Sequence, residues 1–266
     1  MDRSLLVIPL LFLVPQAVTT SPQVDGAAQN QQQARVLIDQ MINALGGKAY
    51  FAIEDVESEG RSGVFNHERS QGSTVYQRLW KWPDKEWLEL GKQRDVVQLT
   101  VGDSMYEITF RGTRMIDPEK SHDAKVYLAR RHHALEIVLR RWLDQPGTAL
   151  FYEGPALTEN HAVERVTIMT SGSDAVTFAI DRETHLPVKK IFILRNPATR
   201  DRDEIVEIYD NWKRVQEINT PFNTLVTVNG ELSWQYFLNT VSYNNHLADS
   251  VFSPARPLPF AKPSPR

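Results

Sequence analysis

Apolar and polar side chains alternate in short runs through most of the chain after residue 74. Val97, Leu99 and Val101 show this period of two clearly, and Gly102-Asp103 follows as a turn signal. Side chains point alternately to the two faces of a strand, so the pattern predicts short antiparallel strands joined by turns. The predicted strands span residues 74–82, 86–90, 95–101, 105–110, 163–170, 174–181, 187–195, 204–210, 222–229 and 232–243.

Two segments have a helical period instead. Residues 34–45 place apolar side chains at three- and four-residue spacing, and Gly46-Gly47 ends this helix because glycine adopts the left-handed cap conformation easily. Residues 121–143 carry a second apolar stripe, whereas the Gln-, Ala- and Asn-rich residues 22–33 are interpreted as a flexible lead-in. These elements predict a mainly β domain in which the helices cover one face of a curved sheet.

The N-terminal residues have the order of a secretory signal peptide. Arg3 precedes an almost entirely apolar run from Leu5 to Val14, and small or polar residues follow. The run is too short to span a bilayer comfortably. We therefore expect residues 1–28 to direct export, with cleavage between residues 19 and 28, and a single domain over residues 29–254. A Pro-rich tail, residues 255–266, is expected to be extended and poorly ordered.

The composition excludes several classes of protein. The chain has no cysteine, which rules out disulfides, thiolate metal sites, a Cys nucleophile and a lipidated N-terminal Cys. Its 30 Lys and Arg residues are interspersed with 33 Asp and Glu residues, giving a formal net charge of -3. No basic face is implied, so we expect no nucleic-acid partner.

One tripeptide, Gly102-Asp103-Ser104, is similar to the serine region of some lipid esterases. Such a nucleophile needs a strand-to-helix turn, whereas Ser104 falls between two predicted strands, where Gly-Asp is ordinary hairpin chemistry. The chain also contains no Gly-x-Ser-x-Gly motif. We therefore interpret this tripeptide as a turn.

Other polar groups give no catalytic or metal site. His132, His133 and Glu136 lack a second His at metalloprotease spacing, and we interpret them as a solvated helix face. Glu86 and Glu89 are interpreted as surface charge, because spacing gives no reason to bring them together in a cleft. The sequence thus predicts a protein that is not an enzyme and uses no metal or cofactor.

Aromatic side chains gather on one face of the predicted strand at 74–82. Tyr76, Trp80 and Trp82 share the parity of Arg78. The aromatics could line a lipid pocket or form core beneath the helices, and Arg78 could receive an anionic head group or hydrogen-bond a closing lid. The candidate ligand-binding residues are Tyr76, Arg78, Trp80, Trp82, Tyr106 and Phe110.

Several segments together resemble a known family. Gln77–Leu90 (QRLWKWPDKEWLEL) and Val96–Phe110 (VVQLTVGDSMYEITF) are similar to paired strands of the periplasmic outer-membrane lipoprotein carrier family, the LolA-like proteins. The segments Tyr209–Val215, Thr220-Pro221 and Val241–Pro254 resemble the closing part of that family. The resemblance extends from the first helix to residue 254.

The resemblance implies an unclosed β-barrel, strongly bent, with helices forming a lid over the concave face and an apolar cavity. It also implies a periplasmic protein that binds lipoprotein acyl chains or another lipid, with inner- and outer-membrane transfer proteins as partners and no cofactor. One position departs from the family. Aligned by Pro83, Trp82 stands where the best-known carriers have an arginine whose hydrogen bonds hold the lid closed.

Three functions follow from these observations. The first is a periplasmic carrier or binding protein for lipoproteins or lipids. The second is a non-catalytic envelope scaffold that uses the same fold to bind a protein partner. The third is an envelope-lipid hydrolase acting through Ser104.

Overall fold

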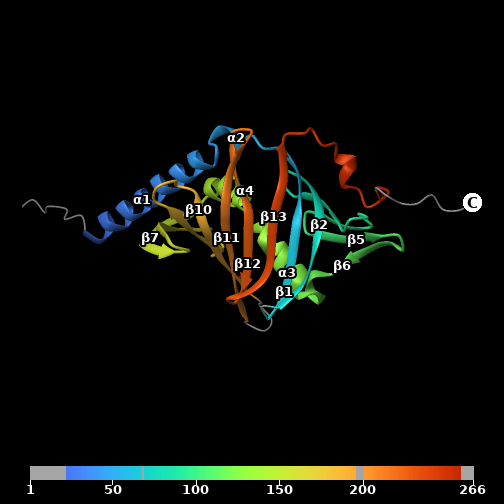
Figure 1. Cartoon of the computed structure of the whole chain (residues 1–266). Helices are drawn as coiled ribbons and strands as arrows, with labels where there is room; N and C mark the ends of the chain where they lie inside the picture. Colours follow the sequence, from blue (N-terminus) through green and yellow to red (C-terminus); the bar gives the residue numbers. More distant parts are fainter. Residues whose placement is uncertain (1–21, 68, 196–200, 259–266) are drawn as a thin grey trace, which may run out of the picture.

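The computed structural model describes residues 22–67, 69–195 and 201–258 (Figure 1). Within them, thirteen strands form one antiparallel sheet in the order β6-β5-β4-β3-β2-β1-β13-β12-β11-β10-β9-β8-β7. The pairing of β1 with β13 joins the two halves of the sheet. The strands are β1 (Asp55–Asn66), β2 (Arg69–Lys81), β3 (Lys85–Leu90), β4 (Val96–Val101), β5 (Ser104–Thr109), β6 (Gly112–Ile116), β7 (Ala149–Thr158), β8 (His161–Met169), β9 (Ala175–Asp181), β10 (Pro187–Arg195), β11 (Arg202–Val215), β12 (Ile218–Val228) and β13 (Glu231–Tyr243).

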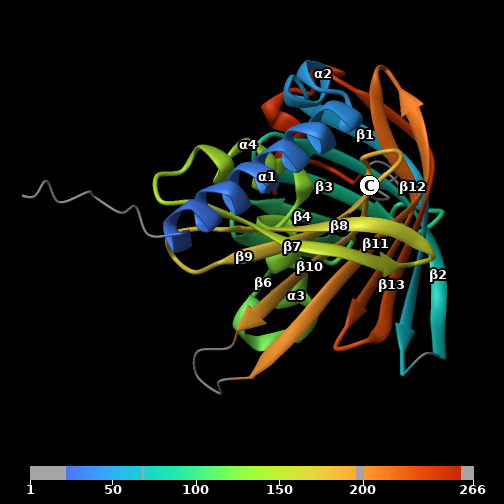
Figure 2. The same cartoon turned by 90° about the vertical axis from the view of Figure 1, so that its left-hand side faces the viewer.

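The helices lie against the inner face of the curved sheet. Helix α1 packs across β7 and β8 (Figure 2). The segment containing α3 and α4 links β6 to β7, the two edge strands, so it crosses the concave face from one edge to the other. The helical elements are α1 (Pro22–Leu45), α2 (Lys48–Phe51), α3 (His122–His132), α4 (Leu135–Arg140) and the 3-10 turns η1 (Pro118–Lys120), η2 (Trp142–Asp144) and η3 (Asp249–Phe252).

This architecture confirms the expected fold class, an open and strongly curved antiparallel sheet with helices over its concave face. All the predicted strands are present, although β2 and β11 are longer than the alternation indicates. The sequence pattern does not predict β1, β6 and β7. In β1 (DVESEGRSGVFN), small and charged side chains occupy both faces and hide the period of two. The domain boundaries at residues 29 and 254 stay a prediction.

Two expectations about the helices were wrong. Residues 22–33 are the first half of α1 rather than a flexible lead-in, since Ala and Gln are favourable helix residues. The second helical segment is broken between α3 and α4, where Ala134 has an extended backbone (φ -62°, ψ 147°). Residues 1–21 lie outside the described part of the chain, and the signal peptide with its cleavage between 19 and 28 stays a prediction.

The main hydrophobic core lies between the helices and the second half of the sheet. Ile38 and Met41 of α1 pack with Ile168 and Phe178 of β8 and β9, and all four are completely buried. Side chains of α4, including Val138, belong to the same cluster. The core therefore fixes the helices on the concave face at one side of the molecule.

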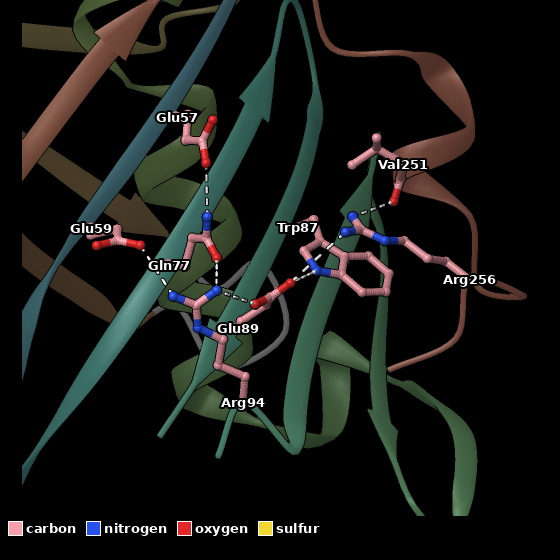
Figure 3. Close-up of polar contacts among 8 residues, drawn as sticks. All are labelled: Glu57, Glu59, Gln77, Trp87, Glu89, Arg94, Val251 and Arg256. Carbon is pink, nitrogen blue, oxygen red and sulfur yellow. Dashed lines mark hydrogen bonds and ion pairs between the residues drawn. The ribbon is translucent and has the colours of Figure 1, made fainter. Parts of the chain in front are cut away.

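A second cluster lies on the outer face of the first half of the sheet. Leu79, Trp87 and Leu99 are cross-strand neighbours there, and Phe252 of η3 covers them. The guanidinium carbon of Arg256 lies 4.4 Å from the centroid of the Trp87 ring (Figure 3). Residues 255–258 of the predicted tail therefore have defined contacts with the sheet, and for these four residues the expectation of poor order was wrong. The rest of that tail, 259–266, lies outside the described residues.

Candidate functional site

A cavity of about 350 Å³ lies between the α3–α4 segment and the concave face of the sheet. Its wall comes from α3 and α4, from β1, β2 and β3, and from β10 to β13. The volume lies near the lower limit of small-molecule sites, which are roughly 300–1,000 Å³. The site is therefore large enough for one small ligand or one chain of a lipid.

One end of the cavity is apolar. Val56 of β1 is the cross-strand neighbour of Tyr243 on one side and Trp80 on the other, and all three side chains line the cavity. Ile218 and Leu135 extend this apolar wall from β12 and α4. An alkyl chain placed here would be removed from water on several sides.

The opposite end has more polar side chains. Ser62 lies six residues beyond Val56 on β1, which corresponds to roughly 20 Å along a strand. Its cross-strand neighbour Tyr236 and the nearby Tyr76 also line the cavity. The cavity wall thus changes along the strands from apolar near Val56 to more polar near Ser62.

Glu86 of β3 is buried at the first of two ionic clusters. The Nε of Arg78 donates to Glu86 Oε2 at 2.6 Å, and Arg131 Nη1 of α3 lies 3.1 Å from the same oxygen. The Tyr127 hydroxyl, also on α3, donates to Glu86 Oε1. Burial by itself would raise the pKa of the Glu86 carboxyl, but Arg78 and Arg131 lower it. This cluster connects α3 to the first half of the sheet.

Glu207 of β11 forms the second cluster, on the other side of α3. Arg130 Nε donates to Glu207 Oε1 at 2.7 Å, and Lys190 Nζ lies 3.0 Å from Glu207 Oε2. The Tyr209 hydroxyl donates to the same Oε2 at 2.7 Å, and Arg130 Nη1 donates to the Tyr236 hydroxyl at 3.2 Å. Helix α3 is therefore held to both halves of the sheet by charge.

The burial of this second cluster is nearly complete. Lys190 is 1% exposed and Glu207 is 6% exposed. Burial alone would raise the pKa of the Glu207 carboxyl, but Lys190 and Arg130 lower it to about 2. Burial also lowers the pKa of the Lys190 ammonium group, and Glu207 offsets part of that effect. Neither ion can lose its partner without leaving an uncompensated buried charge.

The structure brings together half of the residues expected to contact a ligand. Tyr76, Arg78 and Trp80 lie on one face of β2 and line the cavity. Tyr106 packs against the outer-face cluster, and the Phe110 side chain is 79% exposed just after β5. Tyr106 therefore lies on the side of the sheet away from the cavity, and neither aromatic lines the cavity.

Trp82 lies beyond the end of β2 and packs against the main core. Its ring meets the Trp80 ring edge-on at 6.3 Å between centroids. The guanidinium carbon of Arg140 lies 3.6 Å from the Trp82 centroid, and Arg140 Nη1 donates to the backbone oxygen of Ile53 at 2.7 Å. The arginine of this contact, Arg140, therefore comes from helix α4, and its aromatic partner, Trp82, comes from the segment just after β2.

Sequence reasoning missed most of the charged wall. Glu86 and Glu89 are 3% and 2% exposed, so interpreting them as surface charge was wrong. Both stand beside Trp87, Leu88 and Leu90 in β3, and this setting is the sequence signal that could have indicated burial. Lys190 likewise precedes Ile191 and Phe192, and Glu207 stands between Val206 and Ile208. Their partners Arg130 and Arg131 carry no comparable signal.

Other candidate chemistry is not assembled at the cavity. Ser104 pairs with Val101 across a two-residue hairpin, which is no strand-to-helix turn. His132 is exposed beside Asp103, at 2.7 Å. His133 is buried and its ring stacks on Phe192 at 4.1 Å, so the solvated-face interpretation was wrong for this residue.

The described residues contain no candidate metal site and no candidate membrane-spanning helix. Among them, no group of three or more His, Cys, Asp or Glu side chains is arranged to hold a metal ion. None of the helices in this part of the chain has the length and apolarity needed to cross a membrane.

Comparisons with known proteins agree with the fold. A DUF1329 family protein from Desulfovibrio piger superposes with a TM-score of 0.56 at 11% identity, over 83% of this chain and 97% of that one. A putative outer membrane lipoprotein-sorting protein domain from Vibrio parahaemolyticus gives 0.58 at 9% identity, over 82% and 97%. A LolA superfamily protein from Nitrosomonas europaea gives 0.55 at 9% identity, over 83% and 97%. No protein-family model and no curated protein matches the sequence. The chain has a LolA-like fold.

Proposed function

We propose that this protein binds lipids or the acyl chains of lipoproteins in the periplasm. The acyl chain of the ligand lies in the apolar end of the cavity. The observation that carries this proposal is the wall formed there by Val56, Trp80 and Tyr243 beneath Leu135 of α4. Each methylene group buried in such a place contributes about 0.8 kcal/mol. One structure with the same fold is described as a lipoprotein-sorting domain, which supports the same class of ligand.

Tyr76, Arg78 and Trp80 are the proposed ligand contacts among the residues singled out from the sequence. Transfer of cargo between inner- and outer-membrane proteins is part of the proposal, as is export by the N-terminal signal peptide. No catalytic step and no cofactor is included. Ligand binding here rests on burial of a chain and on hydrogen bonds to its polar end.

Native mass spectrometry of the protein purified from a periplasmic extract tests this function. We expect acylated molecules bound to the folded protein, released when the protein is denatured. An empty protein in a stable complex with another envelope protein would instead support the scaffold function. An empty protein without any partner that also fails to take up added myristate or myristyl alcohol would contradict lipid binding.

Filling the cavity should prevent uptake of a chain. Ser58 is 5% exposed on β1 and lines the cavity, so Ser58→Phe places a phenyl ring in the ligand volume. We expect at least about a tenfold loss of affinity for a fluorescent fatty acid, because methylene contacts are lost. Ser73→Phe, on the exposed part of β2, is the matched control and should bind as the unmodified protein does. Equal affinities of the unmodified protein, Ser58→Phe and Ser73→Phe would mean that the fatty acid binds outside this cavity.

A further inference from the structure

The charged wall of the cavity does not balance. Four cationic side chains line it against three carboxylates, giving a formal excess of one positive charge. The cations are Arg78, Arg130, Arg131 and Lys190, and the carboxylates are Glu86, Glu136 and Glu207. An unbalanced charge away from bulk water is unfavourable unless a counter-ion approaches it. The cavity therefore favours an anion.

Arg78 has donors to offer. Within the described part of the chain, its Nε is the atom of this side chain that has a hydrogen-bond partner, Glu86 Oε2 at 2.6 Å. Its side chain is 34% exposed, and that surface belongs to the wall of the cavity. The planar guanidinium can present two further N–H groups side by side, a geometry suited to a carboxylate or phosphate.

Two neighbours strengthen this position. Arg131 Nη1 is buried and lies 3.1 Å from Glu86 Oε2, but no aligned hydrogen bond satisfies it. Tyr76 lies two residues before Arg78 on the same face of β2, and its hydroxyl has no hydrogen-bond partner among the described residues. A guanidinium, a second cation and a phenol thus lie together beside the cavity.

The apolar end gives the site a direction. Trp80 follows Arg78 by two residues on the same face and belongs to the layer of Val56 and Tyr243. A ligand held by its anionic group at Arg78 can therefore extend its chain past Trp80 into this layer. In the opposite direction along β2, the alkyl chain of the ligand would meet Tyr76 and the more polar end of the cavity.

We propose that the cavity selects an amphiphile with an anionic head, a carboxylate or a phosphate, which Arg78 and Tyr76 hold while the chain lies against Trp80, Val56 and Tyr243. The inference rests on the proposed lipid-binding function and specifies the class of lipid. A neutral amphiphile of the same chain length fills the apolar layer but leaves the positive charge unbalanced. The head group, rather than the chain, therefore decides which amphiphile binds.

Isothermal titration of the full-length folded protein with myristate, myristyl alcohol and inorganic phosphate tests the proposal. We expect myristate to bind about ten- to a hundredfold more tightly than the alcohol, the ratio typical of hydrogen bonds to a charged group. Arg78→Met should remove this preference, measured as the ratio of the two affinities within the same variant. Arg61→Met, on the exposed face of neighbouring β1, is the matched control and should keep the preference.

The possible outcomes separate the two proposals. Equal affinities for myristate and the alcohol would overturn the anionic-head inference and leave lipid binding intact. Absence of binding by both amphiphiles would overturn lipid binding itself. Phosphate binding as tightly as myristate would identify a site for a free anion and also overturn the inference. The unmodified protein alone decides between these outcomes, so the result stands even if Arg78→Met does not fold.

Discussion

A Glu207→Gln substitution is expected to lower the free energy of unfolding by about 3–5 kcal/mol, the usual effect of removing one member of a buried ion pair. The carboxylate meets Arg130 at 2.7 Å through one oxygen and Lys190 at 3.0 Å through the other. An amide of the same shape fills the space but leaves both cations without a counter-charge. Urea denaturation at neutral pH measures the difference.

The control for this substitution is Glu231→Gln. Glu231 has an exposed side chain whose Oε2 lies 3.2 Å from Nδ1 of exposed His67. Pairs of this kind contribute between zero and about 1 kcal/mol, so its substitution should change little. A Glu207→Gln protein as stable as the Glu231→Gln protein would show that the cluster does not hold α3 in place.

The same cluster predicts how stability changes in acid. The pKa of Glu207 is lowered from 4.5 to about 2 in the folded protein, so its stabilising effect is complete above pH 4.5. It is lost as the pH falls toward 2, when the folded protein also takes up the proton. The shift corresponds to roughly 3 kcal/mol. The unmodified protein should therefore lose more stability between pH 4.5 and pH 2 than Glu207→Gln does.

The strands were predictable because their alternation is a local property. The sheet pairs mainly neighbours in sequence, so a period of two followed by a turn is enough to locate each strand. Strands β1, β6 and β7 are exceptions, and in β1 the reason is that Ser58, Gly60 and Ser62 replace apolar residues on the cavity face. At Gly60 a Cβ atom would come within 2.3 Å of the Phe237 backbone oxygen, which explains the absence of a side chain.

The orientation of side chains was harder to predict than the strands. Trp80 pairs with Glu86 and Leu90 pairs with Val96, so even-numbered residues of β2, β3 and β4 face the cavity. Val101 pairs with Ser104 across a two-residue loop, and this pairing exchanges even and odd positions in β5. Tyr106 therefore faces outward. Counting through the Gly102-Asp103 turn would have shown this from the sequence.

The ionic clusters could not be predicted in the same way. Arg130 and Glu207 are 77 residues apart and meet because the α3–α4 segment crosses from one edge of the sheet to the other. On α3 alone, Arg130 and Arg131 are consistent with a solvated face, since they lie away from the apolar stripe. Their burial depends on the curvature of the sheet, a property that no local pattern specifies.

Trp87→Ala, on the outer face of the sheet, is expected to lower the free energy of unfolding by about 3–5 kcal/mol. This loss is similar to that expected for Glu207→Gln. The indole is completely buried, and its Nε1 donates to Glu89 Oε1 at 2.8 Å. Phe252 packs against the same cluster and Arg256 stacks on the ring (Figure 3). Removing the indole therefore leaves a cavity and takes a hydrogen-bond donor from the buried Glu89 carboxylate. It also removes the ring against which the C-terminal segment packs.

Chemical denaturation measures the global loss, with Phe237→Ala as the control. The Phe237 side chain is 43% exposed on β13, so this truncation should cost less than about 1 kcal/mol. Hydrogen–deuterium exchange of Trp87→Ala then reports on the C-terminal segment. The amides of Val251 and Arg256 donate to Ala248 and Ser253 backbone oxygens, and we expect both to exchange much faster.

The start of that segment has an independent attachment. Asp55 is buried and accepts hydrogen bonds from the backbone N–H groups of Asn245 at 2.6 Å and Leu247 at 3.0 Å. In Trp87→Ala these two amides should stay protected while those of Val251 and Arg256 lose protection. Uniform loss across all four would mean that Trp87 stabilises the whole segment through the global fold. Unchanged protection at Val251 and Arg256 would mean that the ion pairs of Asp249 with the sheet are sufficient to hold it.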